Sequence, residues 1–275
     1  MKDSTVSKYL SLEGKTAIVT GAGGLLGARF CEVLAKAEAK VVAADMNEHA
    51  VRDLAGRLEK VSLLVKPIQV DVTNPDSVQQ MIKSTEGVFG NADILVCCAA
   101  LDPKFDRTHF EAHKNGYEQY PLEAWRASLD VNLTGLFLCT QKAIPGMRAS
   151  GGGSIILLSS IYGMRAPDQR LYLREDGSNF FKPPDYPVTK AGVLGLTRYL
   201  AAYYGKEGIR VNALSPGGVF NGHDESFTVK YAQQTMLGRM MNIQELDGAL
   251  LFLASEASSY MTGANLVVDG GWTAW

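Results

Sequence analysis

The sequence predicts an α/β fold, a single doubly wound domain whose mostly parallel sheet has seven strands and helices on both faces. Short apolar segments alternate with longer segments of helical periodicity along the chain. The apolar segments lack the polar–apolar alternation of half-exposed strands, as parallel strands buried between two helix layers do. No proline- or serine-rich linker or charge block divides the 275 residues, so we expect one domain over 1–275.

The predicted strands are short apolar segments at 15–20, 40–45, 64–70, 92–98, 154–159, 209–214 and 265–268. The predicted helices lie between them at 25–37, 48–60, 75–89, 122–149, 187–204 and 244–254. Asn74 is the expected N-cap of the third helix, and Pro75 suits its first position, where no N–H donor is needed. We expect each crossover between parallel strands to be right-handed.

Composition and charge exclude several classes of function. The chain is 46% hydrophobic and 20% charged, which is typical of a globular protein, and its net charge of −2 provides no basic surface for nucleic acid or anionic membranes. No run of eighteen apolar residues predicts a membrane span, and residues 1–9 lack the apolar segment of a secretory signal. We therefore expect a cytoplasmic protein.

Cysteine and histidine spacings predict neither a disulfide framework nor a metal site. No two cysteines form a CxxC motif, so reduced, buried thiols are expected, with a vicinal redox switch as the alternative. The cysteines are Cys31, Cys97, Cys98 and Cys139. His109 and His113 are four residues apart, but no third metal ligand accompanies them.

Two long polar segments, 101–121 and 164–185, each follow a predicted strand. Loops at the carboxyl ends of parallel strands form the ligand crevice of an open α/β sheet, and long loops are often functional. We interpret them as a polar substrate pocket with a lid, and the alternative is a solvated insertion. The second segment contains the charged residues Arg165, Asp168, Arg170, Arg174 and Lys182.

A glycine-rich turn joins the first strand to the first helix. Gly21, Gly23, Gly24 and Gly27 lie there, with Leu26 at the position of the third glycine in a G-x-G-x-x-G pattern. Glycines at such a turn let the backbone approach a pyrophosphate, which then lies at the helix N-terminus. The turn therefore predicts a dinucleotide site, and a plain tight turn is the alternative.

Asp45 ends the second strand and strengthens this interpretation. A carboxylate at that place accepts hydrogen bonds from ribose hydroxyls and repels a 2′-phosphate. Neither the glycine turn nor Met46 or Asn47 supplies a cation for that phosphate. We therefore predict NAD, with NADP less favoured. Asp71 and Val72, which end the third strand, fit a contact with the adenine edge, although Asp71 could equally cap a turn.

Tyr186 and Lys190 are the pair that points to a reaction. Four residues apart on a helix, their side chains share a face. A neighbouring ammonium favours phenolate, so we expect Lys190 to lower the pKa of Tyr186. A phenol of this kind can exchange a proton with a carbinol oxygen near neutral pH.

The order and spacing of these residues resemble a classical short-chain dehydrogenase/reductase, from about Leu12 to the C-terminus. The resemblance implies a Rossmann-type domain. The motifs that carry it are Thr20-Gly21…Gly27, Asp45, Asp71-Val72, Asn132 in Asp-Val-Asn-Leu-Thr-Gly, Ser160 in Ser-Ser-Ile-Tyr-Gly, Tyr186…Lys190, Asn212-Ala-Leu-Ser-Pro216-Gly217 and Val268-Asp269-Gly270-Gly271.

The resemblance implies a catalytic role for four residues. Tyr186 would be the general acid/base, and Lys190 would lower its pKa and bind the nicotinamide ribose. Ser160 would orient the substrate carbonyl, with a plain turn hydroxyl as the alternative. Asn132 would hold Lys190 and a water in a proton relay, or would simply bond backbone groups.

The resemblance also implies which residues contact the cofactor. They are Gly21, Gly23, Gly24, Leu26, Gly27, Asp45, Met46, Asp71, Val72, Ala99, Tyr186, Lys190, Pro216, Gly217 and Val219. The chain departs from the family pattern at several of these contacts. Leu25 replaces the middle glycine of T-G-x-x-x-G-x-G, Cys97-Cys98-Ala99-Ala100 replaces Asn-Asn-Ala-Gly, and Asn221 stands where a threonine is usual. Ser160 and Tyr186 are 26 residues apart, about twice the usual gap.

The predicted function is oxidation or reduction of a small polar substrate at a secondary alcohol or ketone, with a sugar, sugar acid or sugar nucleotide favoured. The insertion after Ser160 and the C-terminal motif resemble oxidoreductases of bacterial surface-sugar biosynthesis. The alternatives are a 3-oxoacyl-thioester reductase and a catalytically silent nucleotide-binding scaffold or sensor. The resemblance implies a homotetramer or homodimer. Trp272 and Trp275 could close a neighbouring subunit's site or pack at home.

Overall fold

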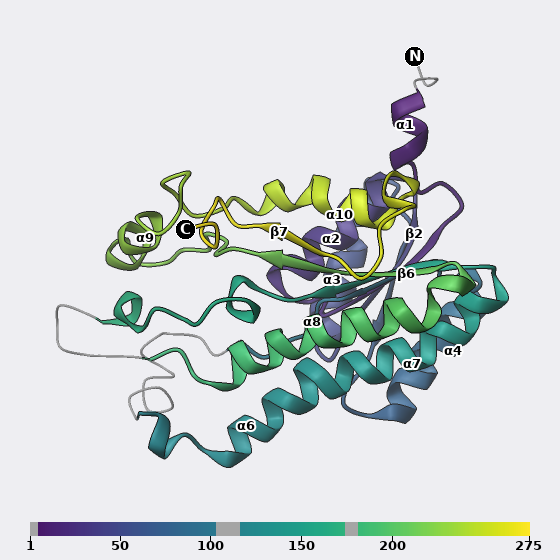
Figure 1. The fold of residues 1–275 in the computed structure, drawn as a ribbon. Helices are drawn as coiled ribbons and strands as arrows, with labels where there is room; N and C mark the ends of the chain where they lie inside the picture. The colour runs from purple at the N-terminus through teal and green to yellow at the C-terminus, as the bar shows by residue number, and fades with distance from the viewer. Residues whose placement is uncertain (1–4, 103–115, 174–180) are drawn as a thin grey trace.

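A seven-stranded sheet, parallel throughout, forms the centre of the molecule (Figure 1). This computed structural model describes residues 5–102, 116–173 and 181–275. The strand order is β3-β2-β1-β4-β5-β6-β7. The strands are β1 (Thr16–Thr20), β2 (Lys40–Asp45), β3 (Val65–Gln69), β4 (Ile94–Cys97), β5 (Gly153–Leu158), β6 (Ile209–Pro216) and β7 (Asn265–Val268). The predicted fold class is confirmed, and β1 and β4 lie side by side at the switch point where ligands bind in such sheets.

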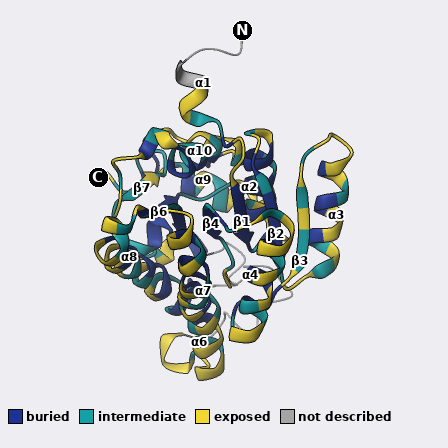
Figure 2. Cartoon of the chain, turned by 90° about the vertical axis from the view of Figure 1, so that its right-hand side faces the viewer, coloured by how far each residue is buried: buried dark blue, intermediate teal, exposed yellow. Residues whose placement is uncertain are grey.

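Helices cover both faces of the sheet. The described α-helices are α1 (Thr5–Leu10), α2 (Leu25–Lys36), α3 (Glu48–Glu59), α4 (Pro75–Phe89), α6 (Leu122–Leu129), α7 (Gly135–Ala149), α8 (Asp185–Tyr204), α9 (Glu225–Ala232) and α10 (Asp247–Ala254). One core cluster joins α2, α3 and α10 to the sheet, and the other joins α4, α7 and α8 to it. Figure 2 shows buried central strands between helices whose outer sides are exposed, whereas the edge strands β3 and β7 are only partly buried. This arrangement explains the apolar strands read from the sequence.

Helix boundaries follow the sequence signals closely, with informative exceptions. Asn74 caps α4 and accepts the N–H groups of Asp76 and Ser77. The predicted 122–149 helix is interrupted by a π-helical turn, Asp130–Thr134, which contains Asn132. Such turns are common at functional sites. Helix α8 begins at Asp185, before the proline that the sequence favoured as its start.

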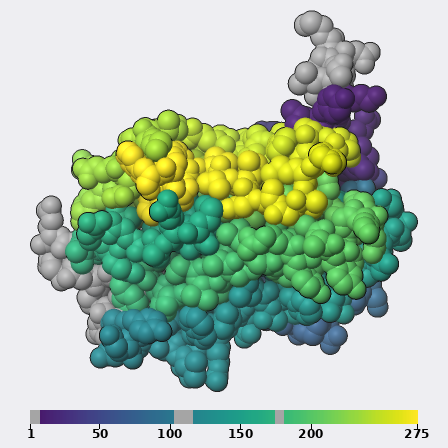
Figure 3. All heavy atoms as spheres, viewed as in Figure 1, coloured from purple at the N-terminus to yellow at the C-terminus, as the bar shows by residue number. Residues whose placement is uncertain are grey.

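Two helices were not expected. The side chain of Asp224 accepts the Phe227 N–H and so caps α9, a signal that the sequence contained. Helix α1 stands away from the body of the molecule (Figures 1 and 3). The C-terminal residues, yellow in Figure 3, form a band along the side of the molecule where β7 is the edge strand. Within the described residues, no helix is long and apolar enough to cross a membrane.

Candidate active site

The turn between β1 and α2 has a backbone that only glycine fits at two positions. Gly21 has a φ of +71°, and a Cβ added there would lie 2.5 Å from the Ala99 nitrogen. A Cβ at Gly27 would lie 2.1 Å from the Gly21 oxygen. The chain thus crosses itself closely at the carboxyl ends of β1 and β4, and this cradle fits the close backbone approach that a dinucleotide needs.

Helix α2 begins at Leu25, the residue that replaces the family's middle glycine. The Gly24 N–H donates to the Gly21 oxygen, which closes the turn. Leu25 is 45% exposed, and both it and Leu26 line the large cavity described below. The leucine therefore does not disturb the turn, and the first N–H groups of α2 remain the donors that a helix start offers to a phosphate.

Asp45 faces this turn from the end of β2. Its carboxylate accepts the Gly23 N–H and the Asn47 N–H, each at 2.9 Å. A Cβ at Gly23 would lie 3.0 Å from the Asp45 Cγ, so the glycine keeps the backbone close to the carboxylate. Met46 beside it is exposed. The local sequence therefore places a negative charge where an adenosine ribose would lie.

The other predicted adenosine contacts have structural partners. Asp71 Oδ1 accepts both the N–H and the hydroxyl of Thr73, so this side chain caps a turn. Val72 is buried and lies where a Cβ on Gly135 would touch it at 2.8 Å. The turn-capping alternative for Asp71 is therefore present in the structure, and its Val72 neighbour belongs to the core.

Ser160 and Tyr186 meet at the cavity wall. Ser160 follows β5, and its Oγ accepts the Tyr162 N–H at 3.2 Å and also hydrogen-bonds the Tyr186 phenol. The Lys190 Nζ is 5.6 Å from the centre of the Tyr186 ring and donates to the Leu158 carbonyl at 2.8 Å. The structure thus brings together three of the four residues predicted to be catalytic.

Gly163 explains how the turn after β5 can reach α8. A Cβ at this position would lie 2.6 Å from the Lys190 oxygen. The Ser159 hydroxyl donates to that same oxygen at 2.7 Å. The Ser-Ser-Ile-Tyr-Gly motif therefore holds the Lys190 backbone against the end of β5.

The pKa values run against the expectation from the sequence. Burial, with a further contribution from Asp102, raises the pKa of Tyr186, and the hydrogen bond with Ser160 opposes this. Burial also lowers the pKa of Lys190 to about 8. The pKa of Tyr186 is therefore raised overall in the protein alone, contrary to the expected lowering, because desolvation of the phenolate outweighs any effect of the Lys190 charge.

Asn132 is fully buried and serves the loop after β4. Its amide oxygen accepts the Leu101 N–H at 2.7 Å, and its nitrogen donates to the Leu101 carbonyl at 3.0 Å. The same nitrogen bonds Thr189 at 3.1 Å and Ser128 at 3.2 Å. The predicted contact with Lys190 is thus indirect, through the preceding Thr189, and the backbone-bonding alternative is what the geometry shows.

The segment after β6 forms the opposite wall. The Gly217 N–H donates to the Val268 carbonyl, and the Gly218 N–H donates to the Tyr231 hydroxyl. Val219 pairs with Met241 in a β-bridge, and the Asn221 N–H donates to His223 Nδ1. These bonds fix a backbone ledge that faces Ser160 and Tyr186 across the cavity.

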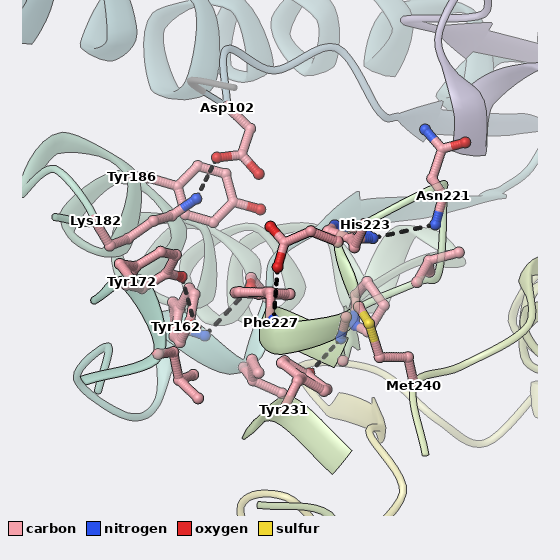
Figure 4. A pocket seen from close by; sticks show the side chains of 18 of the residues that line it. Asp102, Tyr162, Tyr172, Lys182, Tyr186, Asn221, His223, Phe227, Tyr231 and Met240 are labelled. Carbon is pink, nitrogen blue, oxygen red and sulfur yellow. Dashed lines mark hydrogen bonds and ion pairs between the residues drawn. The ribbon is translucent and has the colours of Figure 1, made fainter. Parts of the chain in front are cut away.

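The cavity has a volume of about 660 Å³ and is lined by two of the predicted catalytic residues and by several of the predicted cofactor contacts (Figure 4). Sequence reasoning identified part of its lining: Leu26, Ser160, Tyr186, Lys182, Pro216, Gly217, Val219 and Asn221. It placed Asp102, Leu171 and Tyr172 only as members of the two predicted substrate segments, and it assigned no site role to Tyr162, His223, Asp224, Phe227, Tyr231 and Met240. Spacing could have indicated only Phe227 and Tyr231, which are four residues apart on α9.

The predicted role of the charged insertion needs correction. Asp168 and Arg170 pair with each other, and Arg165 donates to the Thr273 carbonyl. None of these three lines the cavity. Lys182 does, and it forms an ion pair with Asp102. Arg174, His109, His113 and the parts of the two predicted substrate segments at 103–115 and 174–180 lie outside the described residues.

Aromatic side chains support the cavity from behind. A small core cluster combines Tyr162 and Tyr172 of the insertion with Tyr231 of α9 and Trp272 near the C-terminus. The Trp272 ring lies 5.9 Å from that of Tyr162 in an edge-to-face arrangement and 6.4 Å from that of Tyr231. Trp272 therefore packs within its own subunit, whereas Trp275 is 65% exposed.

The cysteines are all free thiols. Cys31, Cys97 and Cys139 are buried, and burial raises the pKa of Cys98 to about 12. Such thiols are poor nucleophiles, which disfavours the vicinal redox switch. Over the described ranges, no group of three or more His, Cys, Asp or Glu side chains could hold a metal ion.

Comparisons with known proteins identify the family of the chain. A family model described as enoyl-(acyl carrier protein) reductase matches residues 21–273. Cis-4-hydroxycyclohexanecarboxylate dehydrogenase of Sinomonas cyclohexanicum is 34% identical over 94% of this chain and 97% of its own. D-threitol dehydrogenase of Mycolicibacterium smegmatis is 32% identical over 95% of this chain and 94% of its own.

Solved structures show the same fold. A short-chain type dehydrogenase/reductase from Mycobacterium marinum is 33% identical, with a TM-score of 0.85 over 98% of this chain and 99% of that one. A gluconate 5-dehydrogenase from Burkholderia cenocepacia, in complex with NADP and tartrate, is 29% identical, with a TM-score of 0.86 over the same shares. The chain therefore belongs to the short-chain dehydrogenase/reductase family and is an NAD(P)-dependent oxidoreductase.

Proposed function

We propose that this protein uses NAD to interconvert a secondary alcohol and a ketone on a small polar substrate, of the sugar, sugar acid or sugar nucleotide class. The observation that carries the proposal is the single cavity lined by Ser160, Tyr186 and the Pro216–Val219 ledge, with polar side chains opposite. The turn at Gly21 and Gly27 supplies the adjoining cradle for a dinucleotide.

In this mechanism Tyr186 receives the hydroxyl proton of the substrate when the alcohol is oxidised and returns it when the ketone is reduced. Ser160 bonds the same oxygen and holds the reacting carbon in place. The bound nicotinamide supplies the hydride acceptor or donor. Its positive charge in the oxidised form, together with protonated Lys190, favours the Tyr186 phenolate that burial alone disfavours.

Asn132 acts as a positioning residue. It fixes the backbone of Leu101 and touches Thr189, next to Lys190. Among the remaining predicted cofactor contacts, Ala99 lies against Gly21 and Lys190 lies behind Tyr186. These residues bind and orient, and the proton passes only through Tyr186 in the first step.

The choice of NAD rests on Asp45. Its carboxylate is fixed by two backbone N–H groups and would repel a 2′-phosphate. One solved relative holds NADP, so the fold by itself does not decide between the two cofactors. We expect NADH to bind more tightly than NADPH, and the measurement is fluorescence titration of both.

The activities for which relatives are named support a polar alcohol as substrate. They include D-threitol dehydrogenase and a probable galactose dehydrogenase of Rhizobium meliloti, which is 32% identical over 96% of this chain. The branch associated with bacterial surface-sugar biosynthesis stays a prediction, based on the insertion after Ser160 and the C-terminal Val-Asp-Gly-Gly-Trp motif.

A second candidate is reduction of a 3-oxoacyl thioester. The 3-oxoacyl-[acyl-carrier-protein] reductase of Thermotoga maritima is 30% identical over 95% of this chain. That reaction usually uses NADPH, which Asp45 disfavours. Oxidation of NADPH with acetoacetyl-coenzyme A at a higher kcat/KM than any polar alcohol gives would favour this candidate.

We also propose a cytoplasmic homotetramer or homodimer. Phe137 on α7 and Tyr199 and Tyr203 on α8 are large and exposed, as residues of a helix-to-helix interface would be. Free cysteines are typical of a reducing compartment. Sedimentation at several concentrations measures the assembly, and a monomer throughout would contradict it.

A screen of NAD⁺ reduction over sugars, polyols, sugar acids and sugar nucleotides tests the proposed function. With an accepted substrate, Tyr186→Phe should lower kcat at least about a hundredfold, because general acid–base catalysis contributes about 10²–10⁴. NADH binding should be unchanged. Tyr199→Phe, on the exposed side of the same helix, is the matched control. Wild-type kcat in Tyr186→Phe would rule out the mechanism.

A further inference from the structure

Lys182 and Asp102 form an ion pair inside the cavity, in contact with Tyr186 (Figure 4). The two residues are 80 positions apart in the chain. The Lys182 Nζ is 4.1 Å from the centre of the Tyr186 ring, nearer than the 5.6 Å of Lys190, and 5.8 Å from that of Tyr162. The family motifs identified in the sequence include neither Asp102 nor Lys182.

The two charges of the pair are not equally accessible. The Lys182 side chain is 4% exposed, whereas the Asp102 side chain is 50% exposed. The ammonium is covered by aromatic rings, and the carboxylate faces the open space. A ligand entering the cavity therefore meets a hydrogen-bond acceptor with negative charge before it meets the cation.

The Asp102 carboxylate also acts on the reacting centre. Its charge contributes to the raised pKa of Tyr186, second only to burial. The phenol oxygen receives the substrate proton in the proposed mechanism. Lys182, the ion-pair partner of Asp102, lies 4.1 Å from the centre of the Tyr186 ring, so the pair adjoins the place where the reacting carbon would lie.

The other polar groups of the lining reinforce this asymmetry. Asp224 adds a second carboxylate, which accepts the Phe227 N–H at the start of α9. Burial lowers the pKa of His223, so its ring is neutral at pH 7. Among the described lining residues, the charged side chains are thus two carboxylates and one covered ammonium.

We propose that Asp102 and Lys182 recognise a neutral polyhydroxylated substrate by binding the hydroxyl next to the reacting carbon. Asp102 accepts the hydrogen of that hydroxyl, and Lys182 donates to its oxygen. A carboxylate in the same place would face Asp102 directly and is disfavoured. The inference rests on the proposed function and narrows its substrate class to polyols and neutral sugars.

Asn132 and Gln169 hold the pair in place. Asn132 bonds both backbone groups of Leu101, the residue before Asp102. Gln169 accepts the Lys182 N–H at 2.8 Å and donates to the Lys182 carbonyl at 3.1 Å. Asp102 and Lys182 lie on the two long segments that follow β4 and β5, and these hydrogen bonds fix the backbone beside each of them.

The test compares kcat/KM for NAD⁺ reduction with alditols, aldonates of the same carbon number, and analogues lacking the hydroxyl beside the reacting carbon. In the wild type, we expect kcat/KM for alditols to exceed that for both other sets at least about tenfold, because only the alditols offer the charged pair a hydroxyl to bind. Asp102→Asn should narrow the alditol-to-aldonate ratio about tenfold or more, and Lys182→Met should widen it.

Asp168→Asn is the matched control, because Asp168 lies in the insertion but pairs with Arg170 outside the cavity. Its substrate ratios should equal those of the wild type. The dissociation constant of NADH should be unchanged in all variants, which separates recognition from damage to the fold.

The outcomes separate this inference from the proposed function. A wild type that prefers aldonates, or Asp102→Asn with an unchanged ratio, would overturn the inference alone. Turnover of simple secondary alcohols such as butan-2-ol, without turnover of any alditol, would do the same. No turnover of any alcohol by protein that binds NADH would overturn both.

Discussion

The cofactor turn and the substrate cavity share Leu25 and Leu26, but they are built in different ways. The turn is local: Gly21, Gly27 and Asp45 lie within 25 residues of one another, and single backbone contacts decide its shape. The cavity is assembled from the ends of β4, β5 and β6, from α9 and from the insertion before α8. Short motifs therefore predict the geometry of the turn in detail, whereas for the cavity they predict the contributing segments but few of the lining residues.

The two regions also differ in what holds them. At the turn, an extra methyl group meets backbone that cannot move aside. Around the cavity, aromatic rings and paired charges fill space between distant segments. We expect single substitutions at the turn to cause a large loss of stability. Substitutions around the cavity should cause smaller, graded changes in stability and substrate binding.

Gly27→Ala should have the largest effect. Its Cβ would lie 2.1 Å from the Gly21 oxygen, so we expect loss of folding or a decrease of more than about 4 kcal/mol in the free energy of unfolding. Gly87→Ala is the control, because nothing lies within 4 Å of its added Cβ in α4; it should stabilise the protein by about 0.5–1 kcal/mol. Denaturant unfolding measures both, and equal effects would remove the distinction between the regions.

Trp272→Ala should lower the free energy of unfolding by about 3–5 kcal/mol, the usual effect of deleting a large buried aromatic side chain. Trp272→Phe should cost much less. It keeps a ring against Tyr162 and Tyr231 and removes only the Nε1 donor, which finds no acceptor among the described residues. In both variants KM for the alcohol should rise while the NADH dissociation constant stays constant. A reversed pattern would assign Trp272 to the cofactor side.

Lys190 lies between the two regions and should make stability depend on pH. Its pKa falls to about 8 in the folded protein from 10.5, so between these values the unfolded chain binds more protons and stability rises with pH. Relative to Lys190→Met, the wild type should gain about 2 kcal/mol in the free energy of unfolding from pH 7.5 to pH 10. If the free energy of unfolding changed with pH in the same way in both proteins, burial would not lower the pKa of Lys190.

Asp45→Ala should have the smallest effect on the protein and a clear one on cofactor choice. We expect the ratio of NADPH to NADH dissociation constants to fall about tenfold, equal to about 1.4 kcal/mol, because a repulsive charge is removed. Asp71→Ala, whose carboxylate caps a turn at Thr73, should leave that ratio unchanged. If this ratio fell equally in both variants, Asp45 would not discriminate between the two cofactors at the ribose.

Much of the fold and part of the site could be predicted because the relevant forces are local or periodic. The apolar strands, the Asn74 cap and the closely packed glycines can each be predicted from a short stretch of sequence. The direction of the Tyr186 pKa could not be predicted, because spacing identified its cationic neighbour but burial outweighed that charge. Arg165, Asp168 and Arg170 were misassigned because composition does not say which charges pair among themselves.

The sequence alone predicted the sheet with its helix layers and the glycine turn, and it identified Asp45, Ser160, Tyr186 and Lys190, the residues to which we assign cofactor binding and catalysis in the proposed function. These depend on hydrophobic periodicity and on motifs whose geometry is carried by a few neighbouring residues. Only the tertiary structure brought Asp102 to Lys182, placed both against Tyr186 and stacked Trp272 behind the cavity. Such contacts join segments far apart in the chain, and their formation depends on how the whole core packs.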